Sequence, residues 1–177
     1  MVFAPFTQSP QHRLFAKQLL EEAFPPEERP TFDDIEKRRN NIYHLCVIEQ
    51  DSKMLGIFAY WNFSTFSYIE HFAIVKTLRN NGIGSAVLSR FLQTGGLGRQ
   101  IVLEVEPPET PLAQRRIDFY QMHGLLLNPQ PYIQPPYIKG GPAVPMQLIT
   151  RFAIDNEEFE KVKNTLYTKV YGQQAAF

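Results

Sequence analysis

The sequence is poor in cysteine and carries no net charge, and these two absences exclude several classes of protein. Cys46 is the one cysteine, which excludes a disulfide framework and a thiolate zinc site and suits a reducing compartment. Because it lies within a strand-like run, we expect a buried, unreactive thiol. Lys and Arg number 18, as do Asp and Glu, so nothing electrostatic predicts a nucleic acid partner.

Long apolar segments are missing as well. No apolar run approaches the ~20 residues that a membrane span requires. The first five residues lack the basic and apolar regions of a signal peptide. The chain has 177 residues, of which 44% are hydrophobic, and this is enough for one folded domain over 1–177 with a substantial core. We therefore expect a cytoplasmic domain without a membrane partner, and both a monomer and a homodimer remain open.

Apolar periodicity predicts helices and strands in the order ααβββαβαββα. Antiparallel strands joined by short turns come first, and a β–α–β crossover follows in the middle of the chain. The predicted fold class is α/β (α+β), with a mixed central sheet flanked by helices. The expected helices cover about 10–23, 32–40, 83–93, 111–123 and 157–171, and the expected strands cover 42–49, 54–62, 66–75, 101–106, 125–127 and 146–154.

Local signals predict where several helices begin and end. Ser9 and Thr110 each precede a proline, a combination typical of an N-cap followed by the first helical residue. Thr31 has an acidic residue three positions later, which resembles a capping box. The Gly95-Gly96 pair is expected to end the third helix.

The most informative segment runs from Arg79 to Ser85, directly after a strand-like apolar run. Gly82 and Gly84 lie one residue apart where an amphipathic helix begins. The first four amides of a helix lack internal partners and lie at the positive end of its dipole. Glycine keeps side chains away from these amides and tolerates positive φ. The segment therefore predicts a bound phosphate group.

Two other phosphate-binding motifs fit this segment less well. A P-loop is excluded because no Gly-Lys-Ser/Thr follows the glycines. A dinucleotide fingerprint gains support from Glu104, about 20 residues beyond the glycines. Against it, Val87 occupies the third glycine position, and antiparallel strands precede the loop. A nucleotide-dependent oxidoreductase and a purely structural turn therefore stay open as alternatives.

A second motif accompanies the loop. Arg-x-x-Gly-x-Gly covers 79–84, and Phe-Tyr-x-x-x-Gly-Leu covers 119–125, about 35 residues later. With these motifs, and with the order of elements over about 6–127, the chain resembles the GNAT superfamily of acyl-CoA-dependent N-acetyltransferases. Leu125 stands where that family usually has phenylalanine. The resemblance implies acetyl-CoA as the co-substrate and an amine as the acceptor.

The resemblance also implies which residues bind the cofactor. In the family, amides of the glycine loop hold the pyrophosphate of coenzyme A, and backbone groups at the end of the preceding strand hold the pantetheine arm. The corresponding residues here are Phe72, Ala73 and Ile74 for the arm, and Arg79, Asn80, Asn81, Gly82, Ile83, Gly84 and Ser85 for the pyrophosphate.

Candidate catalytic groups lie beside these residues. An attacking amine must lose a proton near neutral pH, and Glu70 is the first candidate for the base. Strand alternation places it on one face with Phe72, with His71, the alternative base, on the opposite face. Among aromatic residues, the Glu70 carboxyl is expected to have a raised pKa. Tyr120 occupies the position whose hydroxyl, in the family, protonates the departing thiolate; its helical stripe with Ile117 also fits a core role.

One segment adds a candidate acceptor site. Six of the 14 prolines lie within 128–145, which predicts a stiff, irregular segment. Because Tyr132, Tyr137 and Lys139 lie between these prolines, the segment either forms one wall of the acceptor pocket or packs as a structural loop.

The sequence as a whole predicts an N-acetyltransferase that moves the acetyl group of acetyl-CoA to an amine by direct attack in a ternary complex. The alternative from another class is a non-catalytic acyl-CoA-binding regulatory or interaction module. The histidines show no metal-ligand spacing, so no metal is expected. A small-molecule amine and a peptide amine are both consistent with the sequence as acceptor.

Overall fold

The computed structural model describes residues 1–38, 41–94 and 98–173. These residues form two compact units, Met1–Ile101 and Val102–Phe177, and the expectation of one domain stays a prediction. The expected helix end at Gly95-Gly96 lies outside the described residues. The first unit contains β1 (Val2–Pro5), α1 (Pro10–Ala23), α2 (Phe32–Lys37), β2 (Tyr43–Gln50), β3 (Lys53–Asn62), β4 (Phe66–Ile74) and α3 (Ile83–Thr94), with short 3-10 turns η1 (Phe6–Gln8), η2 (Pro26–Glu28) and η3 (Lys76–Leu78).

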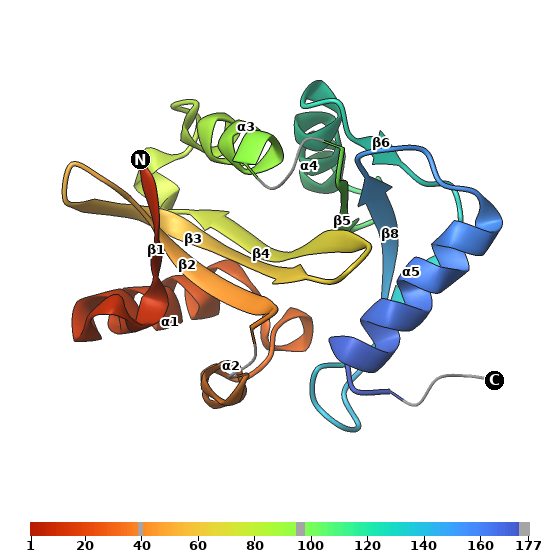
Figure 1. Cartoon of the computed structure of the whole chain (residues 1–177), viewed down its shortest axis with the longest axis horizontal. Helices are drawn as coiled ribbons and strands as arrows, with labels where there is room; N and C mark the ends of the chain where they lie inside the picture. The colour runs from red at the N-terminus through yellow and green to blue at the C-terminus, as the bar shows by residue number, and fades with distance from the viewer. Residues whose placement is uncertain (39–40, 95–97, 174–177) are drawn as a thin grey trace. The chain divides into compact units, whose positions relative to one another are not determined.

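Four antiparallel strands form the sheet of the first unit, in the spatial order β1-β2-β3-β4. The turn between β2 and β3 contains Asp51 and Ser52 at φ 51° and 59°, as a two-residue hairpin turn with matching twist requires. Figure 1 shows α1 and α2 on one face of these strands and α3 on the other. The α3 face contains an aromatic cluster in which the Phe58 ring lies 5.1 Å from Phe72 and 4.7 Å from Phe91.

The helix starts predicted from local signals are confirmed. The side chain of Ser9 accepts a hydrogen bond from the His12 amide at 3.2 Å. The hydroxyls of Thr31 and Thr110 cap α2 and α4 (Pro111–Met122) in the same way, each at 3.1 Å. These caps form from residues three positions apart, so the sequence alone is enough to predict them.

Strand β8 (Val144–Thr150) is the centre of the second unit. It pairs antiparallel with β5 (Gln100–Val105), with β6 (Leu126–Leu127) and with β7 (Tyr132–Gln134). Helix α5 (Asn156–Lys169) begins with a capping box in which Asp155 and Glu158 bond each other's backbone amides.

Two short strands were not predicted. β1 spans four residues and pairs with β2 along Glu49 to Cys46, too short a segment for a periodic signal. β7 lies inside the segment expected to be irregular over 128–145, and β8 starts at Val144 and ends at Thr150 instead of covering 146–154. The prolines obscured this pairing because they cannot donate to a ladder, although they are tolerated at strand edges.

Candidate active site

The predicted phosphate loop connects β4 to α3 in the first unit. The Arg79 side chain donates from Nε to the carbonyl oxygen of Ile74 at 2.8 Å, which ties the loop to the end of the strand. Asn80 and Gly82 both have left-handed backbone conformations, with φ of 66° and 74°. Glycine adopts this conformation without strain, whereas most other residues are strained in it. The backbone therefore turns sharply just before α3 begins at Ile83.

The amides of this loop are arranged as an anion-binding site requires. The hydrogen bond from the Ala86 amide to the Gly82 carbonyl spans 3.0 Å, so the amides of the preceding residues lie in the first turn, where a helix has no internal acceptor. A Cβ added at Gly82 would meet no heavy atom within 4 Å. Asn81 and Gly82 are exposed, whereas Ile83, Gly84 and Ser85 are half-buried. The turn is thus open to a phosphate group at the positive end of α3.

The end of β4 offers backbone groups of two kinds. The Val75 amide donates to the Leu55 carbonyl of β3 at 3.0 Å, so by alternation Ala73 also faces β3. A Cβ built on Gly56 of β3 would lie 2.4 Å from the Ala73 oxygen, which agrees with this direction. The backbone groups of Phe72 and Ile74 therefore point away from β3, and the Ile74 carbonyl accepts the hydrogen bond from Arg79.

Glu70 lies in a β-bulge, which corrects the predicted faces of β4. Ala59 lies opposite His71 and Tyr60 opposite Ile69, so Glu70 is an extra residue of β4. Its Oε2 accepts a hydrogen bond from Trp61 Nε1 at 3.1 Å.

Its carboxylate shares a face with the neighbouring histidine, because Glu70 Oε2 lies 3.8 Å from His71 Nδ1. The Phe72 ring lies in the aromatic cluster on the α3 face. The expectation that Glu70 shares a face with Phe72, opposite His71, is therefore wrong, because the bulge interrupts the alternation.

Arg38, at the C-terminal end of α2, is the main partner of Glu70. Its Nη1 donates to both carboxylate oxygens of Glu70, at 2.9 and 2.8 Å. The guanidinium carbon lies 4.9 Å from the ring centre of Tyr43 and 5.0 Å from that of Trp61, within cation–π range. The side chain of Glu70 is 0% exposed and that of Arg38 is 14% exposed, so this is a buried ion pair between aromatic rings.

This ion pair reverses the expected electrostatics. Burial by itself raises the pKa of the Glu70 carboxyl. The charge of Arg38, with the hydrogen bonds from Arg38 and Trp61, outweighs burial and holds that pKa below its ordinary value. The expected raised pKa is therefore wrong. Arg38 was missed by sequence reasoning because its contact with Glu70 spans 32 residues and leaves no local signal.

His71 belongs to the same buried cluster. Its Nε2 donates to the Glu28 carbonyl at 3.1 Å, and its ring lies 4.7 Å from the ring of Phe24. Burial lowers its pKa, although the Glu70 charge opposes this effect. The His71 imidazole is therefore mainly neutral at pH 7, and its Nε2 hydrogen is donated to the Glu28 carbonyl.

Tyr120 lies on α4 in the second unit. Its side chain is half-buried, whereas Ala113 and Ile117 on the same helix are buried. Burial raises the pKa of the Tyr120 hydroxyl to about 12, with the nearby Arg116 opposing the effect. The hydroxyl therefore keeps its proton throughout the neutral range. The Gly124 backbone, at φ 79°, ends this helix as the motif predicted.

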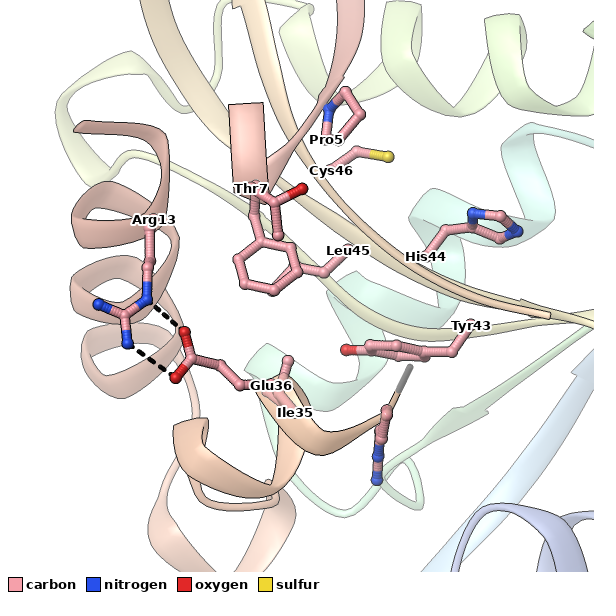
Figure 2. A pocket seen from close by; sticks show the side chains of 11 residues that line it. Pro5, Thr7, Arg13, Ile35, Glu36, Tyr43, His44, Leu45 and Cys46 are labelled. Carbon is pink, nitrogen blue, oxygen red and sulfur yellow. Dashed lines mark hydrogen bonds and ion pairs between the residues drawn. The ribbon is translucent and has the colours of Figure 1, made fainter. Parts of the chain in front are cut away.

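A cavity of about 760 Å³ lies in the first unit, bounded by η1, α1, α2 and the start of β2. Arg13 and Glu36 form an ion pair at its wall, and Figure 2 shows this pair on one side of the cavity with the Tyr43 ring on the other. Arg38 also lines the cavity, so the cavity reaches the residue that binds Glu70. Cys46 is buried beside it, and burial raises the pKa of its thiol to about 11, as expected for an unreactive cysteine.

Two further searches cover only the residues that the structure describes. Among these residues, no group of three or more His, Cys, Asp or Glu side chains is placed to hold a metal ion. Within the same ranges, no helix is long and apolar enough to span a membrane.

Comparison with known proteins supports the family suggested by the motifs. The family model of the GNAT acetyltransferases matches residues 11–125. A GNAT-family structure from Bacteroides thetaiotaomicron is 39% identical, covers 98% of this chain and 100% of its own, and superimposes with a TM-score of 0.91. No curated protein sequence matches the chain.

More distant structures share the fold. The ribosomal-protein-S18-alanine N-acetyltransferase of Escherichia coli is 16% identical with a TM-score of 0.59, over 88% of this chain and 97% of its own. An aminoglycoside 6′-N-acetyltransferase in complex with coenzyme A is 15% identical with a TM-score of 0.56, over 88% and 100%. These structures share the predicted α/β fold, which is confirmed, and the family model with the 39% identical structure favours the catalytic function over a non-catalytic module. The chain belongs to the GNAT family and is an acetyl-CoA-dependent N-acetyltransferase.

Proposed function

We propose that the enzyme transfers the acetyl group by direct attack of a primary amine on the thioester, in a ternary complex with acetyl-CoA. The observation that carries this proposal is the turn between β4 and α3. Its left-handed glycine and the open space beside it suit the pyrophosphate of coenzyme A, as do the first-turn amides, which have no acceptor within the helix. The residues assigned to the cofactor are Phe72, Ala73, Ile74, Arg79, Asn80, Asn81, Gly82, Ile83, Gly84 and Ser85.

In this proposal Glu70 accepts the proton of the attacking amine through water. The Glu70 side chain is fully buried. Because a buried carboxylate does not meet the acceptor directly, the proposal passes the proton through water. Arg38 keeps the carboxylate ionised at neutral pH, which a base needs, although a lowered pKa also makes it a weaker base. His71 is the alternative base, and its neutral form at pH 7 supports that role.

Tyr120 donates a proton to the departing thiolate in the same proposal. The bond from nitrogen to the acetyl carbon forms as the carbon–sulfur bond breaks, and the sulfur leaves with the electron pair of that bond. A hydroxyl whose pKa is about 12 is fully protonated at pH 7 and can supply the proton. A positioned acid of this kind typically contributes ~10²–10⁴-fold to the rate.

The acceptor is an amine whose size and identity are open. The E. coli relative is named for an alanine of a ribosomal protein, and another relative for an aminoglycoside. We propose that a small-molecule or peptide amine serves here, and that residues 128–145 form one wall of its pocket.

Ligand binding tests the donor first. Acetyl-CoA at 100 times its Kd stabilises the fold by ~2.7 kcal/mol, which corresponds to a rise in Tm of roughly 5–10 °C for a chain of this length. NAD, the ligand of the alternative fingerprint, is expected to leave the Tm unchanged. A rise with NAD but not with acetyl-CoA would overturn the assignment of the loop.

Turnover tests the reaction. Release of coenzyme A is followed with a panel of acceptors: a peptide with an N-terminal alanine, an aminoglycoside, a polyamine and simple alkylamines. Acetylation of at least one class, absent without enzyme, is expected. Tight binding of acetyl-CoA without transfer to any amine class would instead favour the non-catalytic module.

A further inference from the structure

One face of the sheet in the second unit carries three polar side chains that the proposed mechanism does not use. In the ladders with β8, Glu104 of β5 lies opposite Leu148, and Tyr132 and Gln134 of β7 lie opposite Met146 and Val144. Residues directly opposite share a face, and every second residue of β8 lies on the same face. Glu104, Tyr132 and Gln134 therefore project from one side of the sheet.

Three neutral donors, two on β7 and one just after α5, hold the Glu104 carboxylate. Its Oε1 accepts a hydrogen bond from the Tyr132 hydroxyl. Its Oε2 accepts one from Gln134 Nε2 at 2.5 Å and one from the Tyr171 hydroxyl at 2.6 Å. Burial and the Glu104 charge raise the pKa of Tyr132, so its hydroxyl stays a donor. Neutral donors fix the direction of a carboxylate without cancelling its charge.

A second acceptor lies beside this carboxylate. Gln134 is 4% exposed, and its amide is oriented by the hydrogen bond from Nε2 to Glu104. Within the described ranges, its Oε1 is buried and has no hydrogen-bond partner. An unsatisfied buried amide oxygen is unfavourable, and here it adjoins a negative charge. The pair of acceptors matches a ligand that donates several hydrogen bonds and carries a positive charge.

Aromatic rings surround the same position. The Tyr132 ring lies 5.8 Å from that of Tyr167, and the Tyr137 ring lies 4.9 Å from that of Tyr171. Ring faces attract organic cations. Tyr137, Tyr167 and Tyr171 are half-buried, as is Glu104, so the cluster is partly open to solvent.

We propose that this cluster binds a protonated primary amine, whose ammonium group donates to Glu104 and to Gln134 Oε1 and whose carbon stem contacts the tyrosine rings. The inference rests on the proposed function, because it assigns the ligand to the acceptor class. A metal ion fits this site poorly, because one carboxylate and one amide oxygen are fewer protein ligands than a bound cation usually takes. The tyrosine hydroxyls add none, since they donate to Glu104.

Binding is tested without acetyl-CoA. Benzylamine and its uncharged counterpart, benzyl alcohol, are titrated at pH 7 and followed by NMR shifts of the protein. Benzylamine is expected to bind at least tenfold more tightly than benzyl alcohol. Glu104→Gln is expected to weaken benzylamine binding roughly tenfold or more, as for loss of a charged hydrogen bond.

Glu106→Gln is the matched control, because Glu106 is on the same segment but pairs with Arg116. The Kd of this variant for benzylamine is expected to equal that of the wild type. Tyr137→Leu removes one ring without touching the carboxylate and is expected to weaken binding about threefold. This second variant decides the matter if Glu104→Gln does not fold. Equal binding of the two probes, or an equal Kd for the Glu104→Gln and Glu106→Gln proteins, would overturn the inference.

Transfer to benzylamine from acetyl-CoA is measured in parallel and separates the two proposals. A raised KM for benzylamine in Glu104→Gln supports the site. Acetylation with a KM that Glu104→Gln leaves unchanged would refute the site while the proposed function stands. Binding that depends on Glu104, without acetylation of any amine in the panel, would refute the proposed function while the site stands.

Discussion

Replacing Arg38 with methionine should strongly destabilise the first unit, and the loss should depend on pH. Methionine keeps much of the stem but removes the cation that Glu70 contacts at 2.8 and 2.9 Å. The Glu70 side chain is 0% exposed, and removing one partner of a buried pair typically costs ~3–5 kcal/mol. Urea denaturation at pH 7.5 measures this cost directly as the change in the free energy of unfolding.

The sign of the pH effect follows from the pKa of Glu70 in the folded wild type and in the folded Arg38→Met variant. In the wild type, the pKa of Glu70 is lowered on folding, so its contribution to stability is present above the unfolded value of about 4.3 and is lost as the pH falls through the folded value. In the Arg38→Met variant, burial dominates and raises the pKa of Glu70 in the folded state. The buried carboxyl can then be protonated as the pH falls, which removes the uncompensated charge. The difference between variant and wild type is therefore expected to be large at pH 7.5 and smaller at pH 5.

Two controls make this test specific. Arg13→Met breaks the ion pair with Glu36, in which the Arg13 side chain is 57% exposed. Because solvent screens that pair, this variant should lose much less stability than Arg38→Met. Adding Glu70→Gln to Arg38→Met removes the buried charge and should restore part of the lost stability. A loss of the same size at both pH values, or no larger than that of Arg13→Met, would refute the assignment of a buried ion pair.

Three further outcomes are expected from the site. Gly82→Ala should cost ~1 kcal/mol of stability because φ is 74°, and it should raise the KM for acetyl-CoA. Gly172→Ala, with φ 64° and equally open space, is the control and should change stability alone. An unchanged KM in Gly82→Ala would exclude Gly82 from the pyrophosphate site. Tyr120→Phe should lower kcat by ~10²–10⁴-fold with an unchanged Kd for coenzyme A, and a normal kcat in a chemistry-limited assay would exclude it as the acid. Because the pKa of Glu70 is lowered, loss of the base should appear in a kcat profile only below the ordinary glutamate pKa of about 4.3. A fall in kcat at higher pH that persists in the Glu70→Gln protein would belong to another group.

The parts of the fold that the sequence predicts well depend on residues close together along the chain. The caps at Ser9, Thr31 and Thr110 involve atoms three residues apart, and the turn at Gly82 needs only its own backbone conformation. Short strands such as β1 exist only through their pairing partners. Their sequences hold too few residues to show a period.

The candidate site divides in the same way. The turn at Gly82 was predictable because its positive φ favours glycine locally, and the phosphate expected there stays a prediction. The environment of Glu70 was not, because a bulge in register with β3 sets its direction and Arg38, 32 residues away, sets its charge. Alternation along a strand assumes an uninterrupted ladder, and a single extra residue reverses the faces of the later residues in that strand.

The two proposed catalytic groups have pKa values displaced in opposite directions, and this bears on the direction of proton transfer. Arg38 holds the pKa of Glu70 below its ordinary value, so at neutral pH the carboxylate can accept a proton but has none to donate. Burial raises the pKa of Tyr120 to about 12, so its hydroxyl can donate a proton but is not a base. Groups whose pKa values lie near 7 can both accept and donate protons at neutral pH. Here Glu70 can only accept a proton and Tyr120 can only donate one. In the proposed mechanism, protons therefore leave the amine toward Glu70 and reach the thiolate from Tyr120, with a smaller driving force for each transfer.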